Sequence, residues 1–263
     1  MTQIPEAIST FVIQSWVHAG RLLTRWRRDR AVLVGSLAFP VCLLFVYVVV
    51  LDERVRKVTG VESVYGLVPV CAVLSGLFGA FSTAVGIQWE RESGLLGRMW
   101  MLPVRRASAL TGRLAAEAVR ALIGSVFITI IGVGMGLRFK HGWPTLLLYC
   151  LIPSILVVGF TAMVMAMAIR TNGRSVMTWL VAATVSIAFL NPGTTPIDQF
   201  PTWLRPLVHL QPMSPPIETM WALAHGGPIL WPLMITLMWT VALLVIFMPM
   251  AVRGYRRAAE STA

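Results

Sequence analysis

Six long stretches of this chain contain no charged residue. They run from 31 to 51, 64 to 87, 121 to 137, 144 to 169, 175 to 190 and 229 to 252. A helix needs about 20 apolar residues to cross a hydrocarbon layer of about 30 Å. Four stretches reach that length unaided, while the third can begin at 112 and the fifth can continue to 195. The pattern predicts an all-α polytopic membrane protein, a single transmembrane domain over 1–263, with six transmembrane helices at 31–51, 64–87, 112–137, 144–169, 175–195 and 229–252.

Residues 9–30 precede the first predicted span and have a different pattern. Apolar residues, two of them Trp, recur at alternating steps of four and three, while arginines occupy the other faces. This spacing is typical of an amphipathic helix with Trp at its apolar edge. We therefore predict an N-terminal helix that lies in the membrane interface.

Small residues recur along two of the predicted spans, where they allow another helix to approach closely. This pattern predicts helix packing, either inside one subunit or at a subunit interface or pathway wall. The residues are Ala72, Gly76, Ala80 and Ala84 in the second span, and Gly132 and Gly136 in the third.

The distribution of basic residues predicts the topology. If the N-terminus is cytoplasmic, 16 of the 22 Lys and Arg residues lie on the cytoplasmic side and 6 on the other side. Short cytoplasmic loops are enriched in Lys and Arg, so both termini are predicted to be cytoplasmic and the chain to lie in the plasma (inner) membrane. The net charge of +11 then reflects topology and contact with anionic membrane lipid, and we expect no nucleic-acid partner.

The chain lacks the motifs of a membrane enzyme. All four histidines lie outside the six apolar stretches, and neither H-E-x-x-H nor G-x-S-x-G occurs. A Walker A loop needs Lys followed by Ser or Thr, but Lys57 and Lys140 are followed by Val and His. We expect no catalytic residue, metal or cofactor in this chain, so active transport would need a motor on another polypeptide.

The longest charged segment, 88–120, lies between the second and third spans. Gly94 and Pro103 delimit a short apolar helix, and Ser108 is a candidate cap for the next helix. Arg113, Glu117 and Arg120 recur at steps of four and three, so they share one helix face and can pair. A short helix held between two membrane helices is a lever on which a partner protein can push.

The last outer segment, 191–228, contains eight prolines but is apolar. We predict two short re-entrant helices within 197–224, buried against protein, with prolines 201, 212, 215 and 216 setting the breaks. Glu218 is either a gate or substrate contact, or an interfacial carboxylate. The candidate outer-gate residues are Phe200, Trp203, Met213, Glu218 and Trp221.

Two pairs of motifs resemble a known family. The first pair is E-R-E-S-G at 90–94 with L-P-V-R-R at 102–106. The second is F-P-T-W-L at 200–204 with Q-P-M-S at 211–214. In this order and topology the chain resembles the permease subunit of ABC-2 type exporters, most closely the daunorubicin-resistance-type permeases of actinobacteria, some of which are linked to export of complex lipids.

The resemblance implies an exporter of an amphiphilic substrate, either a hydrophobic drug or a complex lipid. Two copies of a separate ATP-binding cassette subunit would bind ATP and Mg, and a second permease copy or a sister permease would complete the pathway. The segment 88–106 would contain the coupling helix that docks on the ATP-binding subunit. The residues implied in coupling are Glu90, Arg91, Glu92, Ser93, Gly94, Arg105 and Arg106.

A second hypothesis stays open on the residues alone. The chain would then be a non-transporting membrane protein, either an assembly factor or a scaffold for a lipid-modifying complex. A neighbouring gene for an ATP-binding subunit would favour the exporter.

Overall fold

The fold is a bundle of α-helices in a computed structural model that describes residues 3–28, 30–59, 64–92, 106–140, 142–170, 174–195 and 197–260. No β-strand occurs within these ranges. The helices are α1 (Gln3–Arg28), α2 (Arg30–Thr59), α3 (Val64–Glu92), α5 (Arg106–Gly134), α6 (Trp143–Arg170), α7 (Arg174–Phe189), α8 (Arg205–Leu210), α9 (Ser214–His225) and α10 (Leu230–Glu260), with a 3-10 turn η1 at Ile197–Gln199.

Four of the described helices are long and apolar enough to cross a membrane. Their membrane-length parts are Val64–Glu90, Ser108–Gly134, Pro144–Ile169 and Leu230–Gly254. Two further apolar helical stretches, Val34–Val49 in α2 and Met177–Phe189 in α7, are shorter. The chain is therefore a helical, multi-pass membrane protein, and the count of six spans stays a prediction.

One predicted boundary is wrong. The fifth apolar stretch was expected to continue to 195, but α7 ends at Phe189. Pro192 follows closely and disfavours helical geometry in the residue before it, and the Asn191 side-chain Oδ1 accepts the backbone N–H of Gly193 at 2.8 Å. Asn191 thereby stabilises a turn where the apolar pattern alone suggested more helix.

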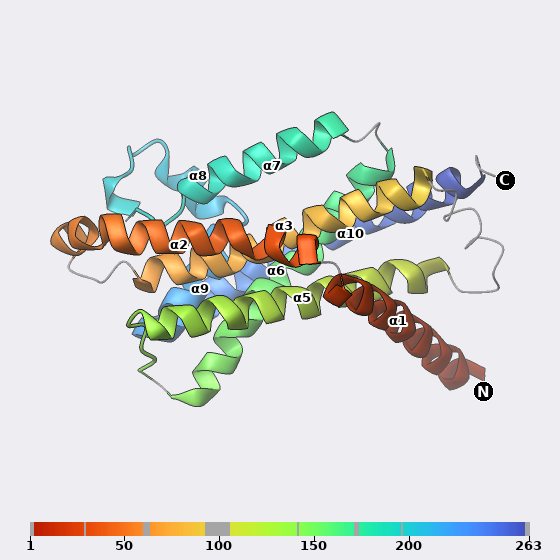
Figure 1. Cartoon of the computed structure of the whole chain (residues 1–263), viewed down its shortest axis with the longest axis horizontal. Helices are drawn as coiled ribbons and strands as arrows, with labels where there is room; N and C mark the ends of the chain where they lie inside the picture. The colour runs from red at the N-terminus through yellow and green to blue at the C-terminus, as the bar shows by residue number, and fades with distance from the viewer. Residues whose placement is uncertain are drawn as a thin grey trace.

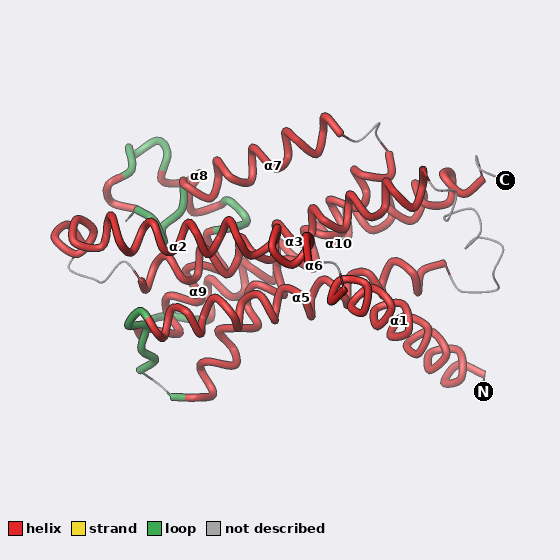
Figure 2. The backbone as a smooth tube through the Cα atoms, in the orientation of Figure 1, coloured by secondary structure: helices red, strands yellow, loops and turns green. Residues whose placement is uncertain are grey.

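The long helices run along the long axis of the molecule, and both termini lie at the same end (Figure 1). Helix α1 leaves the bundle obliquely at that end, whereas α8 and α9 lie toward the other. The described loops also gather at the end away from the termini (Figure 2). We call the two ends the terminal end and the loop end.

Helix α3 is the centre of the bundle and contacts α2, α5, α6 and α9. It runs antiparallel to α5, because successive contacts move in opposite directions along the two helices. Val68 faces Gly132, Gly76 faces Ala121, and Thr83 faces Glu117. Lipid tails are as apolar as these side chains, so close packing, not burial from water, holds such helices together.

The small residues make this close packing possible. Ala72, Ala80 and Ala84 are fully buried, and a Cβ atom on Gly76 would lie 2.5 Å from Val157 Cγ2 of α6. Gly132 packs in the same way, with an added Cβ 2.5 Å from Val68 Cγ2. The small-residue row of α3 therefore serves packing inside one subunit.

Gly136 does not belong to this packing face. Helix α5 ends at Gly134, and Gly136 follows in a turn with φ of 116°. A side chain is strained at positive φ, so Gly at this position permits the turn. The four-residue spacing from Gly132 suggested a continuing helix face, but the helix had already ended.

Candidate functional site

Two ion pairs lie inside the helix bundle toward its terminal end. Glu90, near the end of α3, is paired with Arg113 of α5, and their side chains are 2% and 5% exposed. Deeper in the bundle, Glu117 and Arg120 of α5 form the second ion pair. Glu117 also accepts a hydrogen bond from Thr83 Oγ1 of α3. Charged groups at such burial are stable only when paired and hydrogen-bonded.

The backbone of α3 is shaped to receive Arg120. Gly79 lies directly against the Arg120 guanidinium, in space that a Cβ atom would occupy. Thr83, one turn further along, supplies a hydroxyl to the carboxylate that Arg120 binds. The Gly79–Thr83 spacing places both residues on one face of α3, and this face contacts the Glu117–Arg120 pair of α5.

Helix α1 covers this charged region. Ser15 Oγ lies 2.8 Å from Thr111 Oγ1 of α5, and Ala19 is 1% exposed. Near the end of α1, the Arg25 guanidinium lies 4.7 Å from the ring centre of Trp89, and the Trp26 ring lies 5.8 Å from the Arg120 guanidinium. The predicted N-terminal helix therefore begins earlier than residue 9 and packs on the bundle, while its place in the membrane interface stays a prediction.

His18 lies on the same contact between α1 and α5. Burial lowers the pKa of its imidazole below the ordinary value, and the nearby charge of Arg21 lowers it further. A Cβ atom on Gly112 would lie 2.7 Å from His18 Cβ, so the absence of a side chain at Gly112 lets α1 approach α5 closely.

Sequence spacing identified part of this site. The prediction that Arg113, Glu117 and Arg120 share a face is confirmed, and Glu117 does pair with Arg120. The partner of Arg113, however, is Glu90 on another helix. The sequence places Glu90 in the predicted coupling segment, because Glu90 opens the E-R-E-S-G motif, and local spacing does not predict its partner.

Only some residues of the predicted coupling segment are described. Arg91 and Glu92 are the last two residues of α3, and Arg106 is the first residue of α5. Ser93, Gly94 and Arg105 lie outside the described residues. Ser108 is not a helix cap as expected, because α5 begins at Arg106 and Ser108 is completely buried.

The second candidate region is the outer segment at the loop end. It contains the short helices α8 and α9. Nine of the twelve residues of α9 are buried, whereas only Val208 is buried in α8. Pro212 separates the two helices, but Pro215 and Pro216 lie in the first turn of α9, where Pro is well tolerated. These two prolines therefore mark the start of α9, directly after the break between the two helices.

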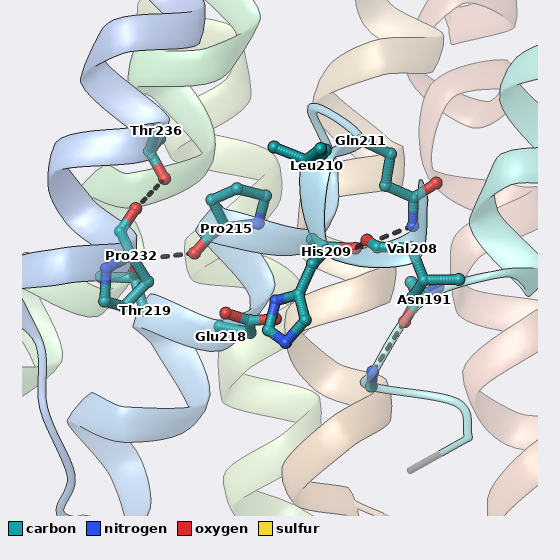
Figure 3. Close-up of polar contacts among 12 residues, drawn as sticks. Asn191, Val208, His209, Leu210, Gln211, Pro215, Glu218, Thr219, Pro232 and Thr236 are labelled. Atoms are coloured by element: carbon teal, nitrogen blue, oxygen red, sulfur yellow. Dashed lines mark hydrogen bonds and ion pairs between the residues drawn. The ribbon is translucent and has the colours of Figure 1, made fainter. Parts of the chain in front are cut away.

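The Q-P-M-S motif joins these helices to the end of α7. Gln211 Nε2 donates to the Leu190 carbonyl oxygen and lies 2.8 Å from Ser214 Oγ. Ser214 Oγ in turn donates to the Val208 carbonyl oxygen at 2.5 Å. Figure 3 shows Gln211 with its amide beside this turn. Trp239 of α10 adds a hydrogen bond from Nε1 to the Leu210 carbonyl oxygen at 3.0 Å.

The predicted outer-gate residues differ in exposure. Met213 is 3% exposed, whereas Trp203 and Trp221 are 75% and 38% exposed and Phe200 is half-buried. Trp221 stacks on His225 with ring centres 5.1 Å apart. Glu218 Oε1 lies 3.2 Å from His209 Nδ1, and Figure 3 shows the two side chains facing each other.

Burial raises the pKa of the Glu218 carboxyl above its ordinary value, and the nearby His209 opposes that rise. The carboxyl is therefore easier to protonate than an exposed one. Among the described residues, no group of three or more His, Cys, Asp or Glu side chains is placed to hold a metal ion.

The membrane-length helices and their contacts define a multi-pass membrane protein. The sequence model of the ABC-2 type transporter family matches residues 13–224. The chain belongs to this family of transport permeases.

Several relatives carry informative names. The chain is 35% identical over 261 residues to the probable doxorubicin resistance ABC transporter permease protein DrrC of Mycobacterium tuberculosis, covering 98% of this chain and 94% of that protein. It is 21% identical to the daunorubicin resistance ABC transporter permease protein DrrB1 of Streptomyces coeruleorubidus, over 95% and 88% of the two chains. Nodulation protein J of Sinorhizobium fredii is 26% identical, over 73% and 77%.

Proposed function

We propose that this chain is the permease subunit of an ATP-driven exporter that moves an amphiphilic compound out across the plasma membrane. The compound is a hydrophobic drug or a complex lipid. The observation that carries the proposal is the 35% identity, over nearly the whole chain, to a protein named as a doxorubicin resistance permease. The apolar helices and the absence of catalytic motifs in the sequence support it.

The motor is a separate ATP-binding cassette subunit in two copies, which binds ATP and Mg. Neither lysine of this chain stands in a Walker A context. A second permease, identical or a sister chain, completes the pathway. A transport cycle needs a partner that contacts the two conformations of the permease differently, and an ATP-binding subunit supplies that difference.

The coupling segment 88–106 docks on the ATP-binding subunit, and the ion pairs carry its movement into the membrane. Glu90 lies near the start of the segment, at the end of α3, and forms an ion pair with Arg113 of α5. Glu117, Arg120 and Thr83 join the same two helices deeper in the bundle. Because both contacts cross between α3 and α5, a push on the segment shifts the two helices together.

The topology is six spans with both termini in the cytoplasm. Support comes from the Lys and Arg distribution and from the position of both termini at one end of the molecule (Figure 1), which an even number of crossings requires. In this orientation the ion pairs lie toward the cytoplasm and α8 and α9 lie toward the outside.

The outer helices α8 and α9 are re-entrant and close the pathway outward. Helix α9 is buried against α3, α6 and α10, as non-spanning backbone at membrane depth must be. Leu207 and Leu210 of α8 are 63% and 61% exposed, which suits contact with lipid or an apolar substrate. Glu218 lies between the two helices and would respond to their separation.

Drug export in cells tests this function. The chain is co-produced with the ATP-binding subunit from its own operon in a drug-sensitive host, and doxorubicin accumulation is measured by fluorescence. We expect reduced accumulation only when both subunits are present. The matched control replaces the Walker A lysine of the ATP-binding subunit with alanine. Equal accumulation with active and inactive motor, for doxorubicin and for a panel of amphiphilic lipids, would contradict the exporter.

A further inference from the structure

A cavity lies beside the two ion pairs, between α1, α3 and α5. Its volume is about 290 Å³, and its walls include all four paired residues together with Arg25 and Trp26 of α1 and Trp89 of α3. The cavity is lined by both charged and apolar groups.

The cavity wall carries a net positive charge. Three arginines and two glutamates line it, and Glu90 and Glu117 are each bound by an arginine of α5. The third arginine, Arg25, is exposed and lies over the Trp89 ring at 4.7 Å. An anion that entered the cavity would meet the Arg25 guanidinium without displacing an existing ion pair.

Trp26, which lines the cavity, also carries a hydrogen-bond donor that needs an acceptor. Trp26 Nε1 is buried and has no hydrogen-bond partner among the described residues. Buried polar groups are normally paired, so a ligand oxygen that reaches this nitrogen on a small rotation of the indole would satisfy the donor. A group with negatively charged oxygens matches both Arg25 and Trp26.

Exposed apolar residues also line the cavity. Val85 and Trp89 of α3 both line it and are 63% and 52% exposed, although they belong to a membrane-length helix. Leu22 and Leu23 of α1 lie opposite and are half-buried. An exposed apolar surface of this kind faces acyl chains in a membrane, so a ligand that fits has an acidic head and an apolar tail.

We propose that this cavity binds the headgroup of an anionic phospholipid of the surrounding bilayer. The phosphate oxygens accept hydrogen bonds from Arg25 and Trp26 Nε1, and the acyl chains lie along Val85 and Trp89. The lipid joins α1 to α3 and α5 next to the ion pairs. The site does not depend on which compound is exported.

Lipid binding to the purified full-length chain tests the site. Native mass spectrometry from detergent measures the Kd of phosphatidylglycerol and of phosphatidylcholine with identical acyl chains. We expect phosphatidylglycerol to bind about tenfold more tightly, because both lipids carry the phosphate but the choline ammonium of phosphatidylcholine is repelled by the positively charged wall. Arg25→Gln removes most of that preference. Arg27→Gln is the matched control, because it removes the same charge in the same helical turn but does not line the cavity.

A second variant tests the indole donor without changing charge. Trp26→Phe should weaken phosphatidylglycerol binding by about tenfold, as expected for one hydrogen bond to an ionised acceptor. Trp16→Phe is its control, because Trp16 is 66% exposed and lies outside the cavity. Size-exclusion chromatography shows whether Arg25→Gln still folds. If it does not fold, Trp26→Phe tests the lipid site by itself.

Three results would overturn the proposal. The first is an equal Kd for the two lipids, and the second is an equal effect of each variant and its control. The third is displacement of the lipid by millimolar inorganic phosphate, which would assign the cavity to a soluble anion. Lipid that stays bound at that phosphate concentration supports the lipid site.

Discussion

Glu90 of α3 and Arg113 of α5 are 23 residues apart in the chain but form a nearly solvent-free ion pair. The pair joins the last turn of one membrane helix to the first part of the next. The pair therefore lies next to the predicted coupling segment along the chain, and it joins the two helices that border that segment.

Removing one member of this pair should destabilise the protein strongly. Glu90→Leu leaves the Arg113 charge buried without a partner, which costs about 3–5 kcal/mol. The double variant Glu90→Leu with Arg113→Met should recover most of this loss, because no charge is then buried. Thermal unfolding in detergent measures the effect, with exposed Arg253→Met as the control. Additive losses in the double variant would show that the two residues do not form a pair.

The packing of α3 on α6 makes a second prediction. Gly76→Ala places a Cβ atom against Val157 Cγ2, and such overpacking costs about 1–3 kcal/mol. Val157→Ala in the same chain should restore stability. Gly35→Ala is the control, because no atom lies within 4 Å of its added Cβ and Ala is the better helix residue. Stability equal to wild type for Gly76→Ala would mean that this helix contact is looser than described.

Topology can be tested by cysteine labelling in a chain whose three cysteines are replaced. Thr202 and Lys140 are exposed at the loop end and Arg253 is exposed near the C-terminus. We expect cysteines at 202 and 140 to react with an impermeant reagent from outside, and a cysteine at 253 only after the membrane is opened. Ser108 is unsuitable as a reporter because it is buried. Labelling of position 253 in intact cells would refute the cytoplasmic C-terminus.

Coupling can be separated from folding by reversing two charges. Arg105→Glu with Arg106→Glu should abolish export and weaken co-purification with the ATP-binding subunit, because the docking contact changes sign. Membrane insertion and thermal stability should stay near wild type. Loss of insertion instead would mean that these arginines only anchor the loop in the cytoplasm, and unchanged export would remove them from coupling.

The Glu218 carboxyl makes a prediction about pH. Its pKa is raised in the folded protein by burial, so the folded state binds this proton more tightly than the unfolded state. Its contribution to stability is present below the ordinary carboxyl pKa and is lost as pH rises through the raised value. Glu218→Gln should flatten the dependence of melting temperature on pH in that window. His209→Gln is the companion variant. It removes the group that lowers the pKa of Glu218, so the pH range over which Glu218 affects stability should become wider.

Much of the candidate site was accessible from local patterns. Helical spacing placed Glu117 and Arg120 within reach of each other, since residues three apart share a helix face. The motifs at 90–94 and 211–214 indicated the family. The same spacing could not supply the partner of Arg113, because Glu90 reaches it only through the antiparallel register of α3 and α5.

The sequence by itself determined the helical membrane class and the family, because long charge-free stretches and ordered motifs are local properties of the chain. Tertiary structure alone decided which charges meet and where helices end against their neighbours. Gly136 falls in a turn and α7 stops at Phe189, although their sequence patterns continue. The cavity beside Trp26 exists only because α1 folds back onto α3 and α5. Such contacts depend on the packing of distant segments, which no local period encodes.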